Sequence, residues 1–315
     1  MNKIKIGVSS CLLGNTVRFD GQHKRDAFIT EVLSEYCDFV PVCPEVECGM
    51  SIPRETLRLV GTPESPRLMT GKTKRDYTTQ MMDWAKNRLE ELAQEDLVAF
   101  IFKTKSPSSG LRAVKVYNQS GHPVSYKGQG LFARAFVERF PDIPVEDEGR
   151  LKDAGLRENF IETIFVLQRW REHVRNGKAA KLVTFHSRHK YTLMAHSPAK
   201  LRVMGALVAR AGLGDFDEIR RTYFQELLTT LQTRKTVKKN TNVLLHVGGY
   251  FKTDLGVEEK EELNREIELY HKGINPLQVP LTLIRHFSRK YKREYLLSQH
   301  FLSPHPVEMG LLNGV

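Results

Sequence analysis

Cysteine is scarce in this chain of 315 residues: there are four, and all lie within the first 48 positions. So few thiols exclude a disulfide-rich secreted framework. The sequence also lacks a signal peptide at its start and any apolar run long enough to cross a bilayer. We therefore expect a cytoplasmic protein with no membrane partner, in which clustered, reduced cysteines more often bind a metal than form disulfides.

The first half of the chain has almost no excess of positive charge, and the second half has a large one. Residues 1–150 hold 21 Lys and Arg against 20 Asp and Glu, whereas residues 151–315 hold 27 against 17. Such an excess favours nucleic acid as a partner, because each neutralised phosphate releases counterions. A well-solvated helical surface is the alternative. The candidate RNA-binding side chains are Lys238, Lys239, Arg289 and Lys290, and no protein partner is evident.

The apolar periodicity changes near position 148. Before it, strand-like runs at 4–8, 39–42, 97–102 and 113–117 alternate with helical stretches, which predicts a doubly wound, mainly parallel α/β domain over residues 1–148. Beyond an acidic, proline-bearing segment, apolar residues recur at helical steps, which predicts a basic all-α domain over residues 149–315 that binds RNA. Helices are expected at 27–35, 78–93, 130–140, 160–174, 199–211, 215–231, 237–250, 257–272 and 280–287.

Three loops that follow buried strands carry cysteine, serine and glutamate. Because the carboxyl ends of parallel strands share one sheet edge, we expect Cys11, Cys43 and Cys48 to meet there as metal ligands, near Ser106. Thiolates favour an iron–sulfur site or zinc, although the paired Cys-x-x-Cys units of structural zinc sites are absent. Cys37, at the end of a predicted helix, is expected to be a small buried hydrophobe.

Two carboxylates flank these cysteines, and spacing along an extended loop does not choose between Glu45 and Glu47. Glu45 is locked behind Pro44 and directly follows the strand end, so it is the better candidate for acid/base chemistry. The alternative is a structural carboxylate that accepts backbone N–H groups. In the second half, His186, His189 and His196 have no carboxylate or cysteine nearby in sequence, which favours phosphate contact or helix packing over a metal site.

With these residues placed, the first half resembles the thiouracil desulfidase family. The resemblance rests on Cys11-Leu-Leu-Gly14, on Cys43-Pro-Glu45 followed by Pro53-Arg54, and on the Ser106-Pro-Ser-Ser-Gly110 turn. The second half resembles the helical domain fused to long members of this family, through Phe185-His-Ser-Arg-His-Lys190, Met194-Ala-His-Ser-Pro198, Thr241-Asn-Val243 and Ser303-Pro-His-Pro306.

The resemblance implies a [4Fe-4S] cluster held by three cysteines, with one iron not bound by the protein. It implies an enzyme that converts 4-thiouridine in tRNA to uridine and releases sulfide without net redox chemistry. Glu45 would move protons, and Ser106 would hydrogen-bond the base or the intermediate. Two alternatives remain: a non-catalytic RNA-binding protein with a structural metal site, and a desulfidase of free thiolated nucleobases.

The chain departs from its relatives at one position. Many of them carry cysteine at the fourth position of the serine turn, where this chain has Ser109. Cys48 is therefore expected to supply the third thiolate. Ser10 and Ser109, on the first and third loops, are candidate substrate-binding residues.

Overall fold

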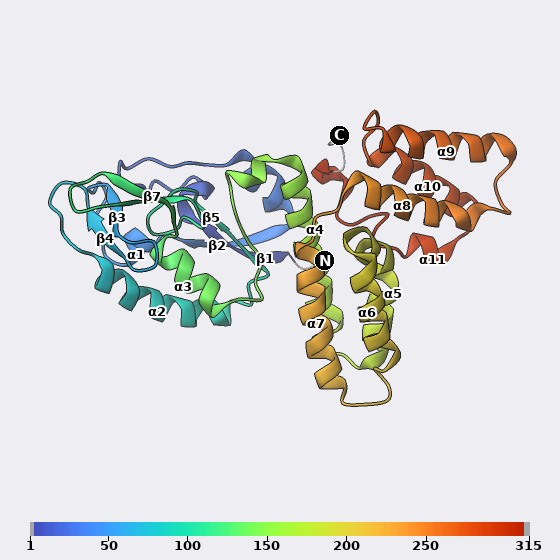
Figure 1. Cartoon of the computed structure of the whole chain (residues 1–315), viewed down its shortest axis with the longest axis horizontal. Helices are drawn as coiled ribbons and strands as arrows, with labels where there is room; N and C mark the ends of the chain where they lie inside the picture. The colour runs from blue at the N-terminus through green and yellow to red at the C-terminus, as the bar shows by residue number, and fades with distance from the viewer. Residues whose placement is uncertain (1–2, 312–315) are drawn as a thin grey trace. The chain divides into compact units, whose positions relative to one another are not determined.

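The structure is a computed structural model that describes residues 3–311. It divides into two compact units, Met1–Asp153 and Ala154–Val315. The division falls a few residues beyond the predicted boundary at 148. The first unit is α/β and the second is helical, which confirms the predicted fold class (Figure 1).

The first unit is built on a four-stranded parallel sheet with the strand order β2-β1-β5-β8. These strands are β1 (Ile4–Ser9), β2 (Cys37–Val42), β5 (Ala99–Phe102) and β8 (Val145–Asp147). Every residue of β5 is buried, as expected of a central strand covered on both faces. The apolar runs in the sequence located β1, β2 and β5 because these strands contribute mainly buried side chains.

Two helices cover one face of this sheet, α2 (Thr78–Gln94) and α3 (Leu131–Arg139), and they lie side by side (Figure 1). Phe100 and Phe102 of β5 stack on each other at 4.2 Å between ring centroids and pack against Phe132 and Phe136 of α3. Gly7 of β1 gives these rings room, because a Cβ there would lie 2.2 Å from the Phe100 ring. Short π- and 3-10-helical turns at Phe28–Val32 and Leu33–Glu35 replace the helix expected at 27–35.

A second sheet was not predicted. It has the order β4-β3-β6-β7 and contains β3 (Leu57–Gly61), β4 (Pro66–Thr70), β6 (Val114–Tyr117) and β7 (Pro123–Gly128). The expected strand at 113–117 belongs to this sheet and not to the parallel one. β3, β4 and β7 carry no continuous apolar run, because few of their residues are buried and they lie within stretches rich in polar residues, Pro and Gly.

The second unit consists of helices α4 (Ala154–His173), α5 (Ala179–His196), α6 (Pro198–Ala209), α7 (Phe216–Gln232), α8 (Val237–Gly248), α9 (Val257–His271), α10 (Gln278–Lys290) and α11 (Glu294–Leu297). Residues 160–167 of α4 are buried without interruption, so this middle part of the helix is enclosed by protein on every side, while both helix ends are partly exposed. The sequence did not predict α5. Its inward positions include His189 and His196, and these polar residues interrupt the apolar stripe that indicates a helix.

Candidate active site

Strands β2, β1 and β5 are neighbours in the parallel sheet, so the loops that follow them leave the same edge. The Ser9 hydroxyl ties two of these strand ends together by accepting a hydrogen bond from the Lys103 backbone N–H at 2.9 Å. A cavity of about 380 Å³ opens at this edge. Its lining includes Ser10, Cys11, Arg18, Phe19, Cys43, Glu45, Arg54, Lys103, Lys105, Ser106 and Ser109.

The serine turn is fixed from within and from α3. The Ser106 hydroxyl accepts hydrogen bonds from the backbone N–H groups of Ser108 and Ser109 at 3.3 and 3.1 Å. The two glycines that follow let backbone pack on backbone: a Cβ at Gly110 would lie 2.5 Å from the Ser106 carbonyl, and one at Gly130 would lie 2.4 Å from the Ser108 carbonyl. The turn therefore presents its hydroxyl groups from a rigid base.

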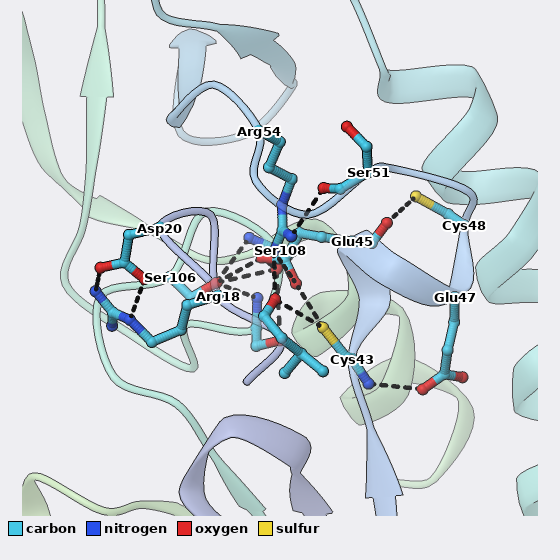
Figure 2. A network of polar contacts seen from close by, with 12 residues as sticks. Arg18, Asp20, Cys43, Glu45, Glu47, Cys48, Ser51, Arg54, Ser106 and Ser108 are labelled. Atoms are coloured by element: carbon cyan, nitrogen blue, oxygen red, sulfur yellow. Dashed lines mark hydrogen bonds and ion pairs between the residues drawn. The ribbon is translucent and has the colours of Figure 1, made fainter. Parts of the chain in front are cut away.

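Glu45 is the carboxylate that faces this turn. It lies on α1 (Pro44–Glu47), a single helical turn that begins at proline directly after β2. Its Oε1 accepts hydrogen bonds from the hydroxyls of Ser108 at 2.5 Å and Ser106 at 3.4 Å. Its Oε2 lies 3.6 Å from the Cys43 sulfur and 3.9 Å from an Arg54 guanidinium nitrogen (Figure 2).

Glu47 lies outside the cavity and makes structural contacts instead. Its Oε1 accepts the backbone N–H of Cys43 at 2.6 Å, and its Oε2 lies 3.1 Å from Nε of Arg88. Figure 2 shows this carboxylate directed away from Glu45 and the serine turn. The structural role that was the alternative for Glu45, a carboxylate that accepts a backbone N–H group, thus belongs to Glu47, while Glu45 lines the cavity.

Two thiols line the cavity. Burial, together with the negative charge of Glu45, raises the pKa of Cys11 to about 11 and the pKa of Cys43 to about 12. Both side chains are therefore protonated near neutral pH in the protein without metal. A metal that binds them must displace those protons, which a soft, thiophilic ion does readily.

Cys48 does not take the predicted place. It packs in an apolar cluster with Met50, Leu59 and Met81, and its sulfur donates to the backbone carbonyl of Glu45 at 3.3 Å. Figure 2 shows its sulfur at the far end of α1 from that of Cys43. The prediction rested on the sheet edge that the loops share, but the helical turn α1 separates the two cysteines, and Cys48 is absent from the lining of the cavity.

Ser109, in contrast, lines the cavity beside the two thiols although it is nearly inaccessible to solvent. Within residues 3–311 the structure shows no group of three or more His, Cys, Asp or Glu side chains arranged to hold a metal ion. Cys11 and Cys43 are thus the two thiols of the cavity that could hold a thiolate-bound cluster, and the Ser109 hydroxyl belongs to the same lining. Cys37 is buried at the start of β2, at the opposite end of that strand from Cys43.

Sequence reasoning gave no role to two residues of the cavity, Arg54, which lies beside the Glu45 carboxylate, and Lys103, which pairs with Glu148. It also did not foresee that Ser108, behind the lining, donates the shortest hydrogen bond to Glu45. Arg54 had a signal, since it belongs to the Pro-Arg pair that follows the Cys-Pro-Glu segment. Ser10, a predicted substrate-binding residue, does line the cavity, and its hydroxyl accepts from the Asn15 amide at 2.8 Å.

The predicted RNA-binding side chains of the second unit differ in how free they are. Lys238 and Arg289 are exposed. The Lys239 ammonium donates to the backbone carbonyls of His196 and Arg234, and Lys290 forms an ion pair with a glutamate of α9 at 2.6 Å. Two of the four are therefore engaged within the protein.

A cavity with thiols, a carboxylate and hydroxyls at the edge of a parallel sheet defines an enzyme-type site on an α/β unit. Residues 6–148 match the family model described as 2-thiouracil desulfurase, and residues 190–306 match a model described as a protein of unknown function (DUF1722).

Two curated proteins and a solved structure are each similar to part of the chain. The Escherichia coli (strain K12) protein YbgA is 32% identical over 152 residues, which are 48% of this chain and 89% of YbgA. The Bacillus subtilis (strain 168) protein YbbK is 32% identical over 131 residues, 40% of this chain and 85% of YbbK. A solved structure, the [4Fe-4S]-dependent thiouracil desulfidase TudS, is 30% identical with a TM-score of 0.39, and the match covers 48% of this chain and 95% of that one.

The chain belongs to the 2-thiouracil desulfurase family through its first unit, as the sequence motifs predicted, and carries a DUF1722 region in its second. No helix among residues 3–311 has the length and apolar character needed to span a membrane.

Proposed function

We propose that this protein is a [4Fe-4S]-dependent desulfidase that converts 4-thiouridine in tRNA to uridine. The observation that carries the proposal is the cavity in which Cys11, Cys43, Glu45 and the serine turn meet, inside the region matched by the desulfurase family model. The net reaction exchanges one atom: water supplies oxygen to C4 of the pyrimidine, and sulfur leaves as sulfide. No electron donor or acceptor is required.

Cys11 and Cys43 would hold the cluster, and Ser109, which lines the same cavity, would be the candidate for a third protein ligand. Such a cluster would supply an iron with an open position, a soft Lewis acid for a thiocarbonyl sulfur. A hydroxyl is a harder and more weakly acidic ligand than a thiol, so we expect a cluster that is lost more easily than one held by three cysteines.

Glu45 is the proton-transfer group in this proposal. Its carboxylate lies between the Cys43 sulfur and the hydroxyls of Ser106 and Ser108, and only 15% of its side chain is exposed. It can take a proton from the attacking water and return it to the departing sulfur. Arg54, at 3.9 Å, balances the negative charge of the carboxylate.

Ser106 is placed to orient the base. Its hydroxyl accepts hydrogen bonds from two backbone N–H groups, which leaves a single O–H to donate, and its present neighbours are Glu45 at 3.4 Å and the Ser108 hydroxyl at 3.0 Å. That O–H can turn to a base in the cavity, which Ser106 lines. A hydroxyl there can hydrogen-bond the pyrimidine ring while the carboxylate acts on the water. These two roles require the Ser106 hydroxyl and the Glu45 carboxylate to stay at fixed positions. Close backbone packing at Gly110 and Gly130 holds the serine turn in place.

The choice of tRNA is supported by the charge of the second half, where residues 151–315 hold 27 Lys and Arg against 17 Asp and Glu. Exposed side chains such as Lys238 and Arg289 are candidate phosphate contacts. A base inside folded RNA must be exposed before its C4 reaches the cavity, so a domain that grips RNA would assist the reaction.

The test is nucleoside mass spectrometry of tRNA that carries 4-thiouridine, incubated with the anaerobically reconstituted protein. We expect 4-thiouridine to disappear, uridine to rise by the same amount, and one sulfide to be released for each conversion. Unchanged 4-thiouridine in tRNA, with turnover of free thiolated bases, would replace tRNA as the substrate. Binding of tRNA without any turnover would instead favour a non-catalytic RNA-binding protein.

A further inference from the structure

The near-neutral charge of the first half of the chain conceals a positively charged second sheet. Residues 57–77 and 114–128, which form this sheet and its turns, hold seven Lys and Arg against two Asp and Glu. The rest of residues 1–150 hold 14 against 18. None of the four strands carries an acidic residue. The first unit therefore has a positive region of its own, and a polyanion is the kind of partner that such a region attracts.

The two faces of this sheet differ in composition. Four buried side chains form the inner face within one apolar cluster: Leu59, Leu68, Val114 and Val116. Neighbouring residues of a strand point to opposite sides of a sheet, so the positions next to these lie on the outer face. The outer face presents two cations and two tyrosines, which we call the sheet face: Arg58, Lys115, Tyr117 and Tyr126.

Each cation of the sheet face lies against a tyrosine ring. The Arg58 guanidinium is 4.9 Å from the ring centroid of Tyr117, and the Lys115 ammonium is 5.5 Å from that of Tyr126. Within residues 3–311 neither cation forms a hydrogen bond or an ion pair. The rings therefore orient both positive charges without neutralising them.

The ring of Tyr126 is open to solvent. Tyr126 is 58% exposed on β7, which is an edge strand of the sheet, and Val124, two positions earlier, is 57% exposed. Burial in the core therefore does not account for this ring. Proteins that bind single-stranded nucleic acid use exposed rings to stack the bases and neighbouring cations to contact the phosphates, in several cases on the open face of a sheet.

The sheet face is continuous with the candidate active site. Strand β3 begins at Leu57, which lines the cavity, and Arg58 is the next residue. A second hollow of about 360 Å³ shares Arg54, Glu55 and Leu57 with the cavity and extends to Arg75, in the turn after β4. An RNA strand with one base in the cavity can therefore place neighbouring nucleotides on the sheet face.

We propose that the sheet face binds single-stranded nucleotides of the RNA substrate, with a base stacked on Tyr126 and phosphates against Lys115 and Arg58. The desulfidase unit then contacts its RNA directly, in addition to any contact of the helical unit. This inference rests on the proposed function for the identity of the RNA, whereas the charges and rings of the sheet face are independent of the desulfidase chemistry.

The first test measures binding of a fluorescein-labelled decauridylate to the full-length protein by fluorescence anisotropy, over a range of salt concentrations. Tyr126→Ala should weaken binding about tenfold, equivalent to about 1.4 kcal/mol, and Tyr126→Phe, which keeps the ring, should bind as wild type. Lys115→Gln should reduce the slope of log affinity against log salt by about 0.7, the value for one phosphate contact on a single strand. Lys86→Gln, which removes an exposed lysine of α2 outside the sheet face, is the matched control and should keep the wild-type affinity and slope.

The second test locates the contact on the protein. Ultraviolet crosslinking of a decanucleotide that carries 5-iodouracil, followed by peptide mass spectrometry, should attach RNA to the peptide that contains Tyr126. Crosslinks confined to the helical unit would overturn the inference, as would Tyr126→Ala and Lys115→Gln proteins that bind the decauridylate like Lys86→Gln. Unchanged RNA binding with loss of self-association in Tyr126→Ala, measured by sedimentation velocity, would assign the sheet face to a second copy of the chain.

The outcomes for the sheet face and for the proposed function are separable. If RNA crosslinks to Tyr126 but 4-thiouridine in tRNA is not desulfurated, the proposed function fails and the RNA surface stands. If wild type and Tyr126→Ala desulfurate tRNA with the same KM, the proposed function stands and this inference fails.

Discussion

Replacing Glu45 with glutamine removes one charge and one proton-accepting oxygen while keeping the size of the side chain. The amide can still accept from Ser108 and Ser106, whose hydroxyls lie 2.5 and 3.4 Å from the present carboxylate. It cannot take a proton from water. Loss of a positioned acid/base group slows a reaction by about 10² to 10⁴, so the barrier should rise by at least about 2.7 kcal/mol.

The same change should not remove the cluster. The charge of Glu45 raises the pKa values of Cys11, Cys43 and Cys48, so its loss makes each thiol easier to deprotonate. Iron and sulfide content per chain should therefore equal or exceed those of the wild type. Turnover per loaded cluster, followed by the loss of 4-thiouridine absorbance under anaerobic conditions, isolates the chemical effect.

Glu47→Gln is the matched control, since Glu47 sits on the same helical turn but bonds to the Cys43 N–H and to Arg88. It should lower the free energy of unfolding but leave the turnover per loaded cluster close to that of the wild type. A Glu45→Gln protein that retains its cluster and turns over within about threefold of wild type would refute the assignment of Glu45.

Three further predictions concern the ligands, the pH dependence and the helical unit. Cys48→Ala should retain the iron content of the wild type, whereas Ser109→Ala should lose iron and Ser109→Cys should hold it longer in air. Iron analysis and electron paramagnetic resonance measure these differences. Loss of iron in Cys48→Ala alone would restore Cys48 as the ligand. Because the pKa values of both cavity thiols are raised, each thiol must release a proton when it binds iron. Iron affinity measured against a chelator should therefore fall about 100-fold per pH unit as the pH is lowered from about 9 to neutrality. An affinity that does not depend on pH would contradict this. Lys235→Ala removes the ammonium that lies 2.7 Å from the buried carboxylate of Glu162 on α4. The free energy of unfolding, measured in urea by Trp170 fluorescence in a Trp84→Phe background, should fall by about 3–5 kcal/mol. A fall below about 1 kcal/mol would show that this pair is not a buried ion pair in solution.

The sequence located the site because its strands are simple to recognise. Continuous apolar runs precede the loops that carry Cys11, Cys43 and Ser106, and parallel strands bring such loops to one edge. The choice of Glu45 over Glu47 agrees with the observed geometry: Pro44 starts a helical turn directly after β2, and on that turn Glu45 faces the serine turn while Glu47 bonds to the Cys43 N–H and Arg88.

Other features depend on local conformation that composition does not reveal. Cys48 was expected in the cavity because its loop follows a parallel strand and because Ser109 stands where relatives carry cysteine, but one turn of helix directs its sulfur into the apolar cluster. Lys235 appears in the sequence as part of a basic cluster, but the structure buries it with Glu158 and Glu162. Long-range pairing of this kind leaves no periodic signal, because its partners lie more than seventy positions apart.

Transfer of oxygen from water to C4 of 4-thiouridine is the step on which the whole account depends. It is measured directly by incubating the reconstituted protein with 4-thiouridine tRNA in water enriched in oxygen-18, then analysing the nucleosides by mass spectrometry and the sulfide released. The account predicts uridine that carries one heavy oxygen, formed in equal amount to sulfide and absent with Cys11→Ala or Cys43→Ala protein. Uridine without the label, or sulfur loss that yields another nucleoside, would contradict it.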